Sequence, residues 1–331
     1  MKNQRLSNGM LRRVLIAFST CVAPIAHAIT YQVTTTADLP DDGLGVTACH
    51  TSAGGCSLRA AIMKANQVDG TDIIHVPAGT YTLTIPPSGA DGDDRGDLNI
   101  TSSIAITGAG AGRTIIDGNA TDRVFDISVG QFVGLTGLTI RNGNQRENGA
   151  GVRNAGILTI DHCTIEDNIT VANGISGDGA GIYSSGSLTV DASLIRSNEV
   201  QGVGNGGGIG SFGTALIRGS TISENTAANG GGIFVVNHGQ YLYVVDSTLS
   251  GNAAYNDGGG IFSVESAGSS NVVGLYSTSV LGNDASNDSD GMGSGGGIYA
   301  PGNNGARFIV VNTIVANNTI NGRNAFDDCA G

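Results

Sequence analysis

Three charged residues hold one position in successive repeats of the sequence and are the best candidates for chemistry. Asp161, Asp191 and Arg218 each close a short stretch in which apolar and polar residues alternate. Carboxylates on neighbouring strands could serve a glycoside hydrolase, and a cationic group beside acids that hold calcium could serve a polysaccharide lyase. The simpler interpretation is a surface ion-pair row, with Arg218 against Asp191, worth about 0–1 kcal/mol. We favour the ion-pair row and assign no catalytic, cofactor-binding or metal-binding residue.

Other polar residues could bind ions or partners. His162 follows Asp161 and could act as a general base, although a single surface histidine is usually only solvated. The acidic run from Asp91 to Asp94 is the one candidate for calcium, but its spacing does not match an EF-hand loop, and no cofactor is expected. Arg95-Gly96-Asp97 spells an integrin-type tripeptide, which we interpret as the end of an acidic loop that leads into a strand.

Two recurring phrases predict the elements that must position these residues. The first is a glycine-rich turn before an apolar residue, at Val152, Ile182, Ile209, Ile233, Ile261 and Ile298. The second is an apolar residue three positions before an asparagine, at Asn168, Asn198, Asn225, Asn252, Asn283 and Asn317. Both recur about every 24–37 residues, a period typical of stacked repeats rather than of one globular core.

Each repeat contains three short strands with alternating apolar residues, which can bury one face only. Three such strands describe one turn of a wide parallel coil, and successive coils stack about 4.8 Å apart. We expect the asparagines to form a column, because Asn tolerates the left-handed bend and its amide can bond to the same residue in the next coil. Cys163 occupies a repeat position that is serine elsewhere, so a small buried residue is expected there.

Residues 1–28 have the features of a secretory signal peptide. The basic residues of this segment are Lys2, Arg5, Arg12 and Arg13. An apolar run from Leu15 to Ala26 follows, and Ala26-His27-Ala28 is a small-x-small cleavage site. The apolar run is too short to span a bilayer. We therefore expect an exported protein, extracellular or at the cell surface and associated with an outer membrane.

Charge and composition restrict the partners. Glycine supplies 54 of the 331 residues and tryptophan is absent, a composition that disfavours helices. The formal net charge is −12, and it becomes about −16 once residues 1–28 are removed. Such a surface repels nucleic acid, so the expected partner is an extracellular polysaccharide or a host or cell-surface protein.

Residues 29–70 are predicted to cap the first coil. Cys49 and Cys56 are close in sequence, with two glycines between them, and predict a small disulfide loop in an oxidising compartment. Two cysteines with His50 are too few ligands for zinc. Ser57 is a plausible N-cap for a helix with an apolar stripe at Leu58, Ala61, Ile62 and Ala65. Such a helix would cover the open first rung.

The cap and the repeats resemble a known family. Cys56-Ser57-Leu58-Arg59-Ala60-Ala61-Ile62 resembles the CSLREA-type N-terminal region of exported bacterial β-helix proteins, with Ala60 where that family has glutamate. Residues 73–85 and 104–118 resemble its first coils, and the GGGI and apolar-x-x-Asn phrases are similar to repeats of polymorphic outer-membrane proteins. The resemblance covers about residues 30–331 and implies a pectin-lyase-like fold outside the cell, but no settled activity.

The expected fold is therefore all-β: a single-stranded right-handed parallel β-helix over residues 71–331 with an N-terminal capping helix. The expected function is a secreted or cell-surface scaffold, non-enzymatic, used in adhesion or surface interaction. The alternative is a polysaccharide lyase or hydrolase, or a polysaccharide-binding protein. Because no capping segment is evident after Asn318, we expect the last rung to continue in a longer chain or to self-associate.

Overall fold

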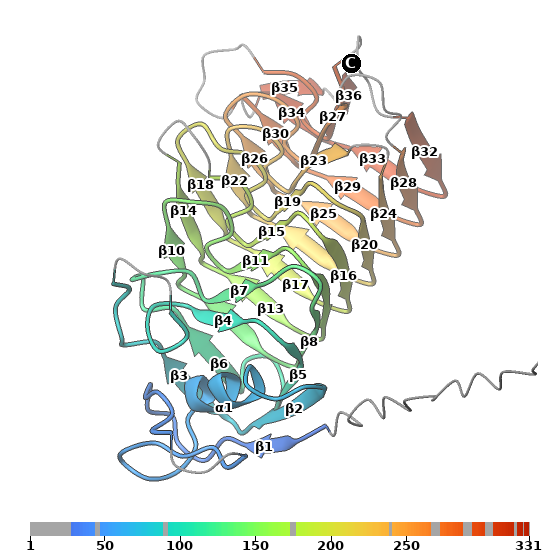
Figure 1. Ribbon diagram of the computed structural model, residues 1–331. Helices are drawn as coiled ribbons and strands as arrows, with labels where there is room; N and C mark the ends of the chain where they lie inside the picture. Colours follow the sequence, from blue (N-terminus) through green and yellow to red (C-terminus); the bar gives the residue numbers. More distant parts are fainter. Residues whose placement is uncertain are drawn as a thin grey trace, which may run out of the picture.

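The protein is a long stack of short strands that begins beside one helix (Figure 1). The computed structural model describes residues 28–43, 47–88, 92–172, 177–237, 240–265, 272–286, 293–301, 307–320, 323–326 and 328–330. The expected signal peptide lies outside these residues, except for Ala28.

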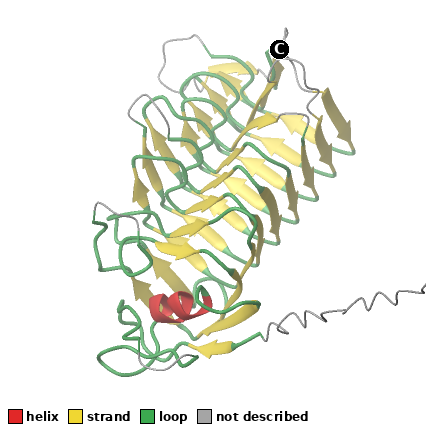
Figure 2. Ribbon diagram, in the orientation of Figure 1, coloured by secondary structure: helices red, strands yellow, loops and turns green. Residues whose placement is uncertain are grey.

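The strands form four sheets, and all paired strands but β34 and β35 run parallel (Figures 1 and 2). Sheet A contains β1 (Thr30–Gln32), β2 (Thr71–Val76), β5 (Ser103–Gly108), β8 (Phe132–Thr136), β12 (Ile157–Asp161), β16 (Ser187–Asp191), β20 (Ala215–Arg218), β24 (Tyr241–Val245), β28 (Val272–Tyr276) and β32 (Arg307–Val311). Sheet B contains β3 (Gly79–Thr82), β6 (Thr114–Asp117), β9 (Thr139–Arg141), β13 (Thr164–Glu166), β17 (Leu194–Arg196), β21 (Thr221–Ser223), β25 (Thr248–Ser250), β29 (Ser279–Leu281) and β33 (Ile314–Ala316). Sheet C contains β10 (Asn144–Gln145), β14 (Ile169–Val171), β18 (Glu199–Gln201), β22 (Thr226–Ala227), β26 (Ala253–Ala254), β30 (Asp284–Ala285), β34 (Thr319–Ile320) and β35 (Arg323–Phe326). Sheet D contains β4 (Leu98–Ile100), β7 (Phe125–Ile127), β11 (Val152–Asn154), β15 (Ile182–Ser184), β19 (Ile209–Ser211), β23 (Ile233–Asn237), β27 (Ile261–Glu265), β31 (Ile298–Tyr299) and β36 (Cys329–Ala330).

The expected right-handed parallel β-helix is confirmed, with one difference in the repeat. A full coil passes through sheets D, A, B and C in turn, so it has four strands rather than the expected three. The missed strands are those of sheet C, such as Thr226–Ala227, which has only two residues. A two-residue strand is too short to show alternation in the sequence.

The core is a set of apolar columns along the stack. In sheet B, one fully buried aliphatic residue of each coil lies over that of the next: Ile140, Ile165, Ile195, Ile222, Leu249 and Val280. Each such side chain stabilises the fold by roughly 1.5–3 kcal/mol. Because each coil buries its inner face only against its neighbours, the stack is stabilised by contacts between rungs.

The turn from sheet B to sheet C combines a left-handed residue with a buried asparagine. φ is 55° at Asp167, 52° at Ser197 and 59° at Glu224, and the next residue in each case is a fully buried asparagine. Each asparagine Nδ2 donates to Oδ1 of the asparagine in the next coil at 2.9 Å. The expected column is therefore confirmed. The asparagines themselves do not take the left-handed conformation; the preceding residue does, which leaves the amide free to point inward.

The last member of this column differs from the expectation. Asn317 has φ of 59° and makes the bend, while Asn318 is fully buried. Asn283 donates to Oδ1 of Asn318 from its backbone N at 3.0 Å and from Nδ2 at 2.9 Å. The assignment of Asn317 was wrong by one residue, because two adjacent asparagines satisfy the same sequence phrase.

A second polar column lines the turn from sheet A to sheet B. The backbone N of Cys163 donates to Oγ of Ser193 at 3.0 Å, and Ser193 and Ser220 donate in the same way to Ser220 and Ser247 at 3.1 Å. Cys163 is buried, as expected.

The N-terminal cap is built as expected from its residues. Helix α1 (Leu58–Ala65) begins at Ser57, whose Oγ accepts from the backbone N of Ala60 at 3.0 Å. Cys49 and Cys56 form a disulfide with their Cα atoms 5.2 Å apart. Within α1, Arg59 and Lys64 are buried and form ion pairs with Asp38 and Asp41 at 2.6 and 2.9 Å.

Near the C-terminus the winding changes. Strand β35 pairs antiparallel with β34, and β36 pairs parallel with β31 of sheet D. Asp328, just before β36, accepts from the backbone N and from Nδ2 of Asn318, both at 3.0 Å. A carboxylate thus takes the place of the next amide in the asparagine column.

Candidate functional site

The structure places the charged row as the sequence indicated. Asp161, Asp191 and Arg218 pair in register at the ends of β12, β16 and β20. Arg218 donates to both carboxylate oxygens of Asp191, at 2.7 and 2.6 Å. Two acids on adjacent rungs lie at about the 5 Å separation of a retaining glycosidase. Here both carboxylates are on an open surface and already hold a cation or a histidine, so the ion-pair interpretation describes the geometry better.

His162 is a corner residue with an exposed side chain. Its φ is 51°, and its side chain is 70 % exposed with Nδ1 2.7 Å from Oδ1 of Asp161. The equivalent corners are Ala192 and Gly219, with φ of 44° and 53°, so the position requires the bend and not an imidazole.

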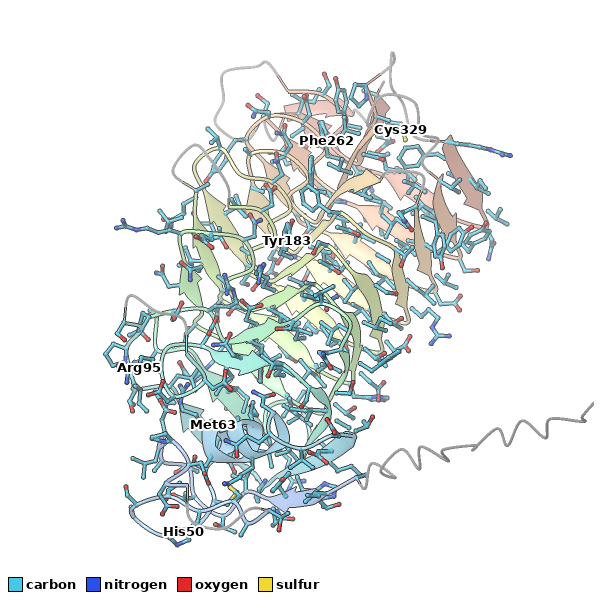
Figure 3. All side chains as sticks on the ribbon, viewed as in Figure 1. His50, Met63, Arg95, Tyr183, Phe262 and Cys329 are labelled. Atoms are coloured by element: carbon cyan, nitrogen blue, oxygen red, sulfur yellow. A yellow bond between two sulfur atoms is a disulfide. The ribbon has the colours of Figure 1, made fainter. Side chains whose placement is uncertain are left out.

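A row of aromatic residues on the outer face of sheet D went unnoticed in the sequence. Neighbouring ring centroids along Tyr183, Phe212, Phe234, Phe262 and Tyr299 are 5.1, 5.9, 5.4 and 5.2 Å apart. Figure 3 labels Tyr183 and Phe262, which lie along the same side of the stack. The signal was present, because most of these residues directly follow the apolar residue after the glycine turn. The neighbouring rings are tilted or stacked against one another at close to the spacing of the strands. Their main contacts are with each other, so the row stabilises the stack more readily than it offers flat faces to a sugar.

A row of short polar side chains runs beside the aromatic row, and each of them precedes the left-handed glycine that opens a glycine turn of the repeats, as Asp178 precedes Gly179. Asp178 Oδ1 accepts from the backbone N of Asn205 at 2.7 Å and from its Nδ2 at 3.0 Å, and Asn229 Nδ2 donates to Asn205 Oδ1 at 2.8 Å. Burial raises the pKa of Asp178 and of Asp257, against hydrogen bonds from backbone amides that lower it. The two acids are three rungs apart, on the order of 14 Å, which exceeds the separation of a glycosidase pair.

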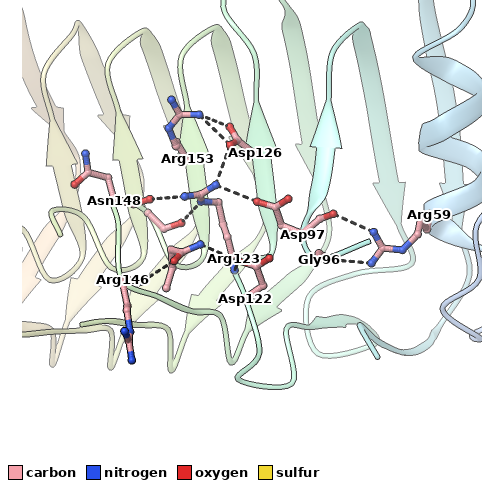
Figure 4. Close-up of polar contacts among 11 residues, drawn as sticks. Arg59, Gly96, Asp97, Asp122, Arg123, Asp126, Arg146, Asn148 and Arg153 are labelled. Carbon is pink, nitrogen blue, oxygen red and sulfur yellow. Dashed lines mark hydrogen bonds and ion pairs between the residues drawn. The ribbon is translucent and has the colours of Figure 1, made fainter. Parts of the chain in front are cut away.

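Among the described residues, the largest group of contacting charges lies near the N-terminal end of sheet D (Figure 4). Arg123 Nη1 bonds to Asp97 Oδ2 at 3.0 Å and to Asp126 Oδ2 at 2.8 Å, and Arg153 Nη1 contacts both oxygens of Asp126. Arg59 joins this group to the cap, because its two Nη atoms donate to the carbonyls of Asp97 and Gly96 at 3.0 and 2.8 Å.

The same contacts show which interpretation of the tripeptide Arg95-Gly96-Asp97 is correct. The Asp97 side chain is 2 % exposed, and β4 begins at the next residue. Arg95 is bonded to Asp94, 2.7 Å away, and this guanidinium lowers the pKa of the Asp94 carboxyl. The tripeptide is therefore the end of a loop entering a strand, and its acid is not presented to a partner.

The acidic run has internal partners where it is described. Asp93 Oδ2 accepts from Asn66 Nδ2 at 3.2 Å, Asp94 holds Arg95, and Asp91 lies outside the described residues. Within the described ranges, no group of three or more His, Cys, Asp or Glu side chains could hold a metal ion. The described part of the chain also contains no helix long and apolar enough to cross a membrane.

A cavity of about 460 Å³ opens beside this charge network, against β10 at the edge of sheet C. Its lining residues are Pro87, Ser88, Arg95, Asp97, Thr121, Asp122, Arg123, Asn144, Gln145, Arg146 and Glu147. Gln145 is fixed at both ends, because Nε2 donates to Asp122 Oδ1 at 2.8 Å and Oε1 accepts from the backbone N of Arg146 at 2.7 Å. The cavity is therefore a preformed polar site.

Comparison with known proteins adds little to this geometry. No family model matches the chain, and no curated protein matches its sequence. A crystal structure of the pectate lyase Pel9A is 13 % identical with a TM-score of 0.46, covering 89 % of this chain and 79 % of its own. The catalytic domain of a GH87 alpha-1,3-glucanase in complex with nigerose is 12 % identical with a TM-score of 0.25, covering 88 % and 69 %. At this level of similarity no activity, substrate or residue role transfers to this chain.

Proposed function

We propose that this protein is an exported, non-enzymatic β-helix scaffold that takes part in adhesion or surface interaction. The observation that carries the proposal is that the polar side chains of the repeating rows bond to one another within the protein. The asparagine and serine columns bond to themselves along the stack, and Asp191 is held by Arg218. Side chains whose polar atoms already make hydrogen bonds or ion pairs within the protein are not available as acids, bases or nucleophiles.

Export is part of the proposal and has separate support. Residues 1–28 have the composition of a signal peptide, and the Cys49–Cys56 disulfide suits an oxidising compartment. We also propose membership of the CSLREA-type family. The residues of that resemblance form the cap: Ser57 starts helix α1, and Arg59 ties it to the coil that contains β4.

The test is incubation of the purified mature chain with a panel of neutral and acidic polysaccharides. We expect retention on one or more of them without new reducing ends or unsaturated products. A variant carrying Asp191→Asn and Arg218→Gln should behave in the same way, because that pair is structural. Product release that the double substitution abolishes would establish the alternative, a polysaccharide lyase or hydrolase.

A further inference from the structure

The cavity beside β10 contains two polar side chains that the fold does not use. Among the described residues, the Arg146 guanidinium and the Asn144 amide make no hydrogen bond or ion pair, and both line the cavity. Figure 4 shows the Arg146 guanidinium standing clear of the charge network. In the part of the chain that the structure describes, most lysine and arginine side chains are paired with an acid, as Arg123, Arg153 and Arg218 are. An unpaired arginine at a preformed cavity is therefore available to a ligand.

The charges of the cavity favour a neutral ligand over an ion. Arg123 is held by Asp97 and Asp126, and Arg95 is held by Asp94, so the charges of the lining without a hydrogen bond or ion pair to another described residue are those of Arg146 and Glu147, one of each sign. An anion would meet Glu147 in a chain of net charge −12, and a cation would meet Arg146. A hydroxyl group can both donate and accept, so it satisfies a lining that offers both kinds of partner.

We propose that this cavity binds a neutral saccharide, as a free oligosaccharide or as the end of a polysaccharide chain. The volume of about 460 Å³ lies in the range of small-molecule sites. Arg146 and Asn144 donate to ring hydroxyls, and Glu147 accepts from them. Asp122 holds the Gln145 side chain, and Gln145 Oε1 in turn accepts a hydrogen bond from the backbone N of Arg146. Gln145 therefore fixes the backbone from which the Arg146 side chain extends. This inference rests on the proposed function, for which it names the ligand class and the site.

The test measures binding of neutral oligosaccharides by calorimetry and by chemical-shift changes, with uronate oligomers and inorganic phosphate as comparison ligands. We expect one neutral series to saturate the site. Arg146→Ala and Asn144→Ala should each weaken binding by roughly fivefold or more, as expected for the loss of one or two hydrogen bonds. Arg113→Ala is the matched control, because Arg113 is also exposed without an acidic partner but does not line the cavity.

A loss of binding in these variants can be told apart from a loss of folding. The side chains of Arg146 and Asn144 make no hydrogen bond or ion pair with other described residues, so both variants should unfold near the temperature of the unsubstituted chain. Tighter binding of uronate or phosphate than of any neutral saccharide would overturn the inference. So would saturable neutral binding that neither substitution weakens, or no binding of any saccharide in the panel.

Failure of this inference can be told apart from failure of the proposed function. If a saccharide binds through Arg146 and is then cleaved, the cavity assignment stands and the non-enzymatic function falls. If the chain adheres to cell surfaces but binds no saccharide in the cavity, the function stands and the cavity assignment falls.

Discussion

Asn225 accepts two hydrogen bonds from Asn198, one from the backbone N at 3.0 Å and one from Nδ2 at 2.9 Å. The same relationship recurs between Asn225 and Asn252, at 3.1 and 2.9 Å. Each asparagine thus satisfies a buried backbone donor of the coil before it, so the column joins rungs through main chain and side chain together.

Asn225→Ala is expected to lower the free energy of unfolding by about 2–3 kcal/mol. The substitution leaves the buried N–H of Asn198 without its acceptor, which costs about 1–3 kcal/mol, and it opens a cavity. Urea denaturation followed by circular dichroism measures the change. Asn256→Ala is the control, because Asn256 is exposed and lies outside the column. A loss below about 0.5 kcal/mol would contradict the role given to the column.

Arg59→Ala is expected to cost about 3–5 kcal/mol, because it leaves Asp38 as a buried charge and removes the donors to two backbone carbonyls. The loss should fall first on the N-terminal rungs, and amide hydrogen exchange of β1, β2 and β4 measures it. Arg113→Ala, at an exposed arginine, should change nothing. Uniform loss of protection along the whole stack would show that the cap and the coils unfold as one unit.

Arg218→Gln is expected to leave the midpoint of thermal unfolding nearly unchanged, because Arg218 is exposed and its side chain bridges to Asp191 alone among the described residues. The small effect should shrink further at high salt, since solvent-exposed charges are screened. Thermal unfolding at low and high ionic strength checks both statements. A large shift of the midpoint would mean that the row supports the coil in a way that the exposed geometry does not explain.

Asp178→Asn is expected to raise stability at neutral pH. Burial raises the pKa of Asp178 in the folded chain, so the folded state binds a proton more readily than the unfolded state. Stability therefore falls as the pH rises from the ordinary Asp value through the raised one, and the asparagine variant escapes this loss. Its amide oxygen can still accept the two bonds from Asn205. Calorimetry from pH 3 to pH 8 should show the advantage vanish at low pH, while Asp69→Asn, at an exposed acid, shows no such trend.

Cys163 should not react with thiol reagents in the native protein at neutral pH. Burial raises its pKa to about 11, so it remains a thiol. Cys163→Ser should fold normally, because serine fills the equivalent position in the following coils. Rapid labelling of Cys163 under native conditions would show that the column opens locally.

The repeats made the fold predictable. Each recurring phrase has a buried residue at the same position, so aligning the phrases gives the register of many strands at once. The capping helix and the disulfide were also readable, since Ser57 and the close cysteines carry local signals. The cavity was not readable. It depends on the loops before β4 and β7 and on β10 with the residues that follow it, which meet only after the chain has wound, and Arg146 belongs to no repeating phrase. The aromatic row was visible in the sequence, but one coil has Gly210 at the aromatic position. In that coil the ring comes from Phe212, two residues later in the chain.

The asparagine column also carries a net dipole along the axis of the stack. It starts where Asn168 Oδ1 accepts from the backbone N of Gly143 at 2.9 Å, and every amide after it donates toward the C-terminal end. Aligned amide dipoles add along such a line, as they do in a helix, and leave partial positive charge at the donating end. The carboxylate of Asp328 stands at that end, so it compensates the polarity of the whole line as an acid does at the start of a helix.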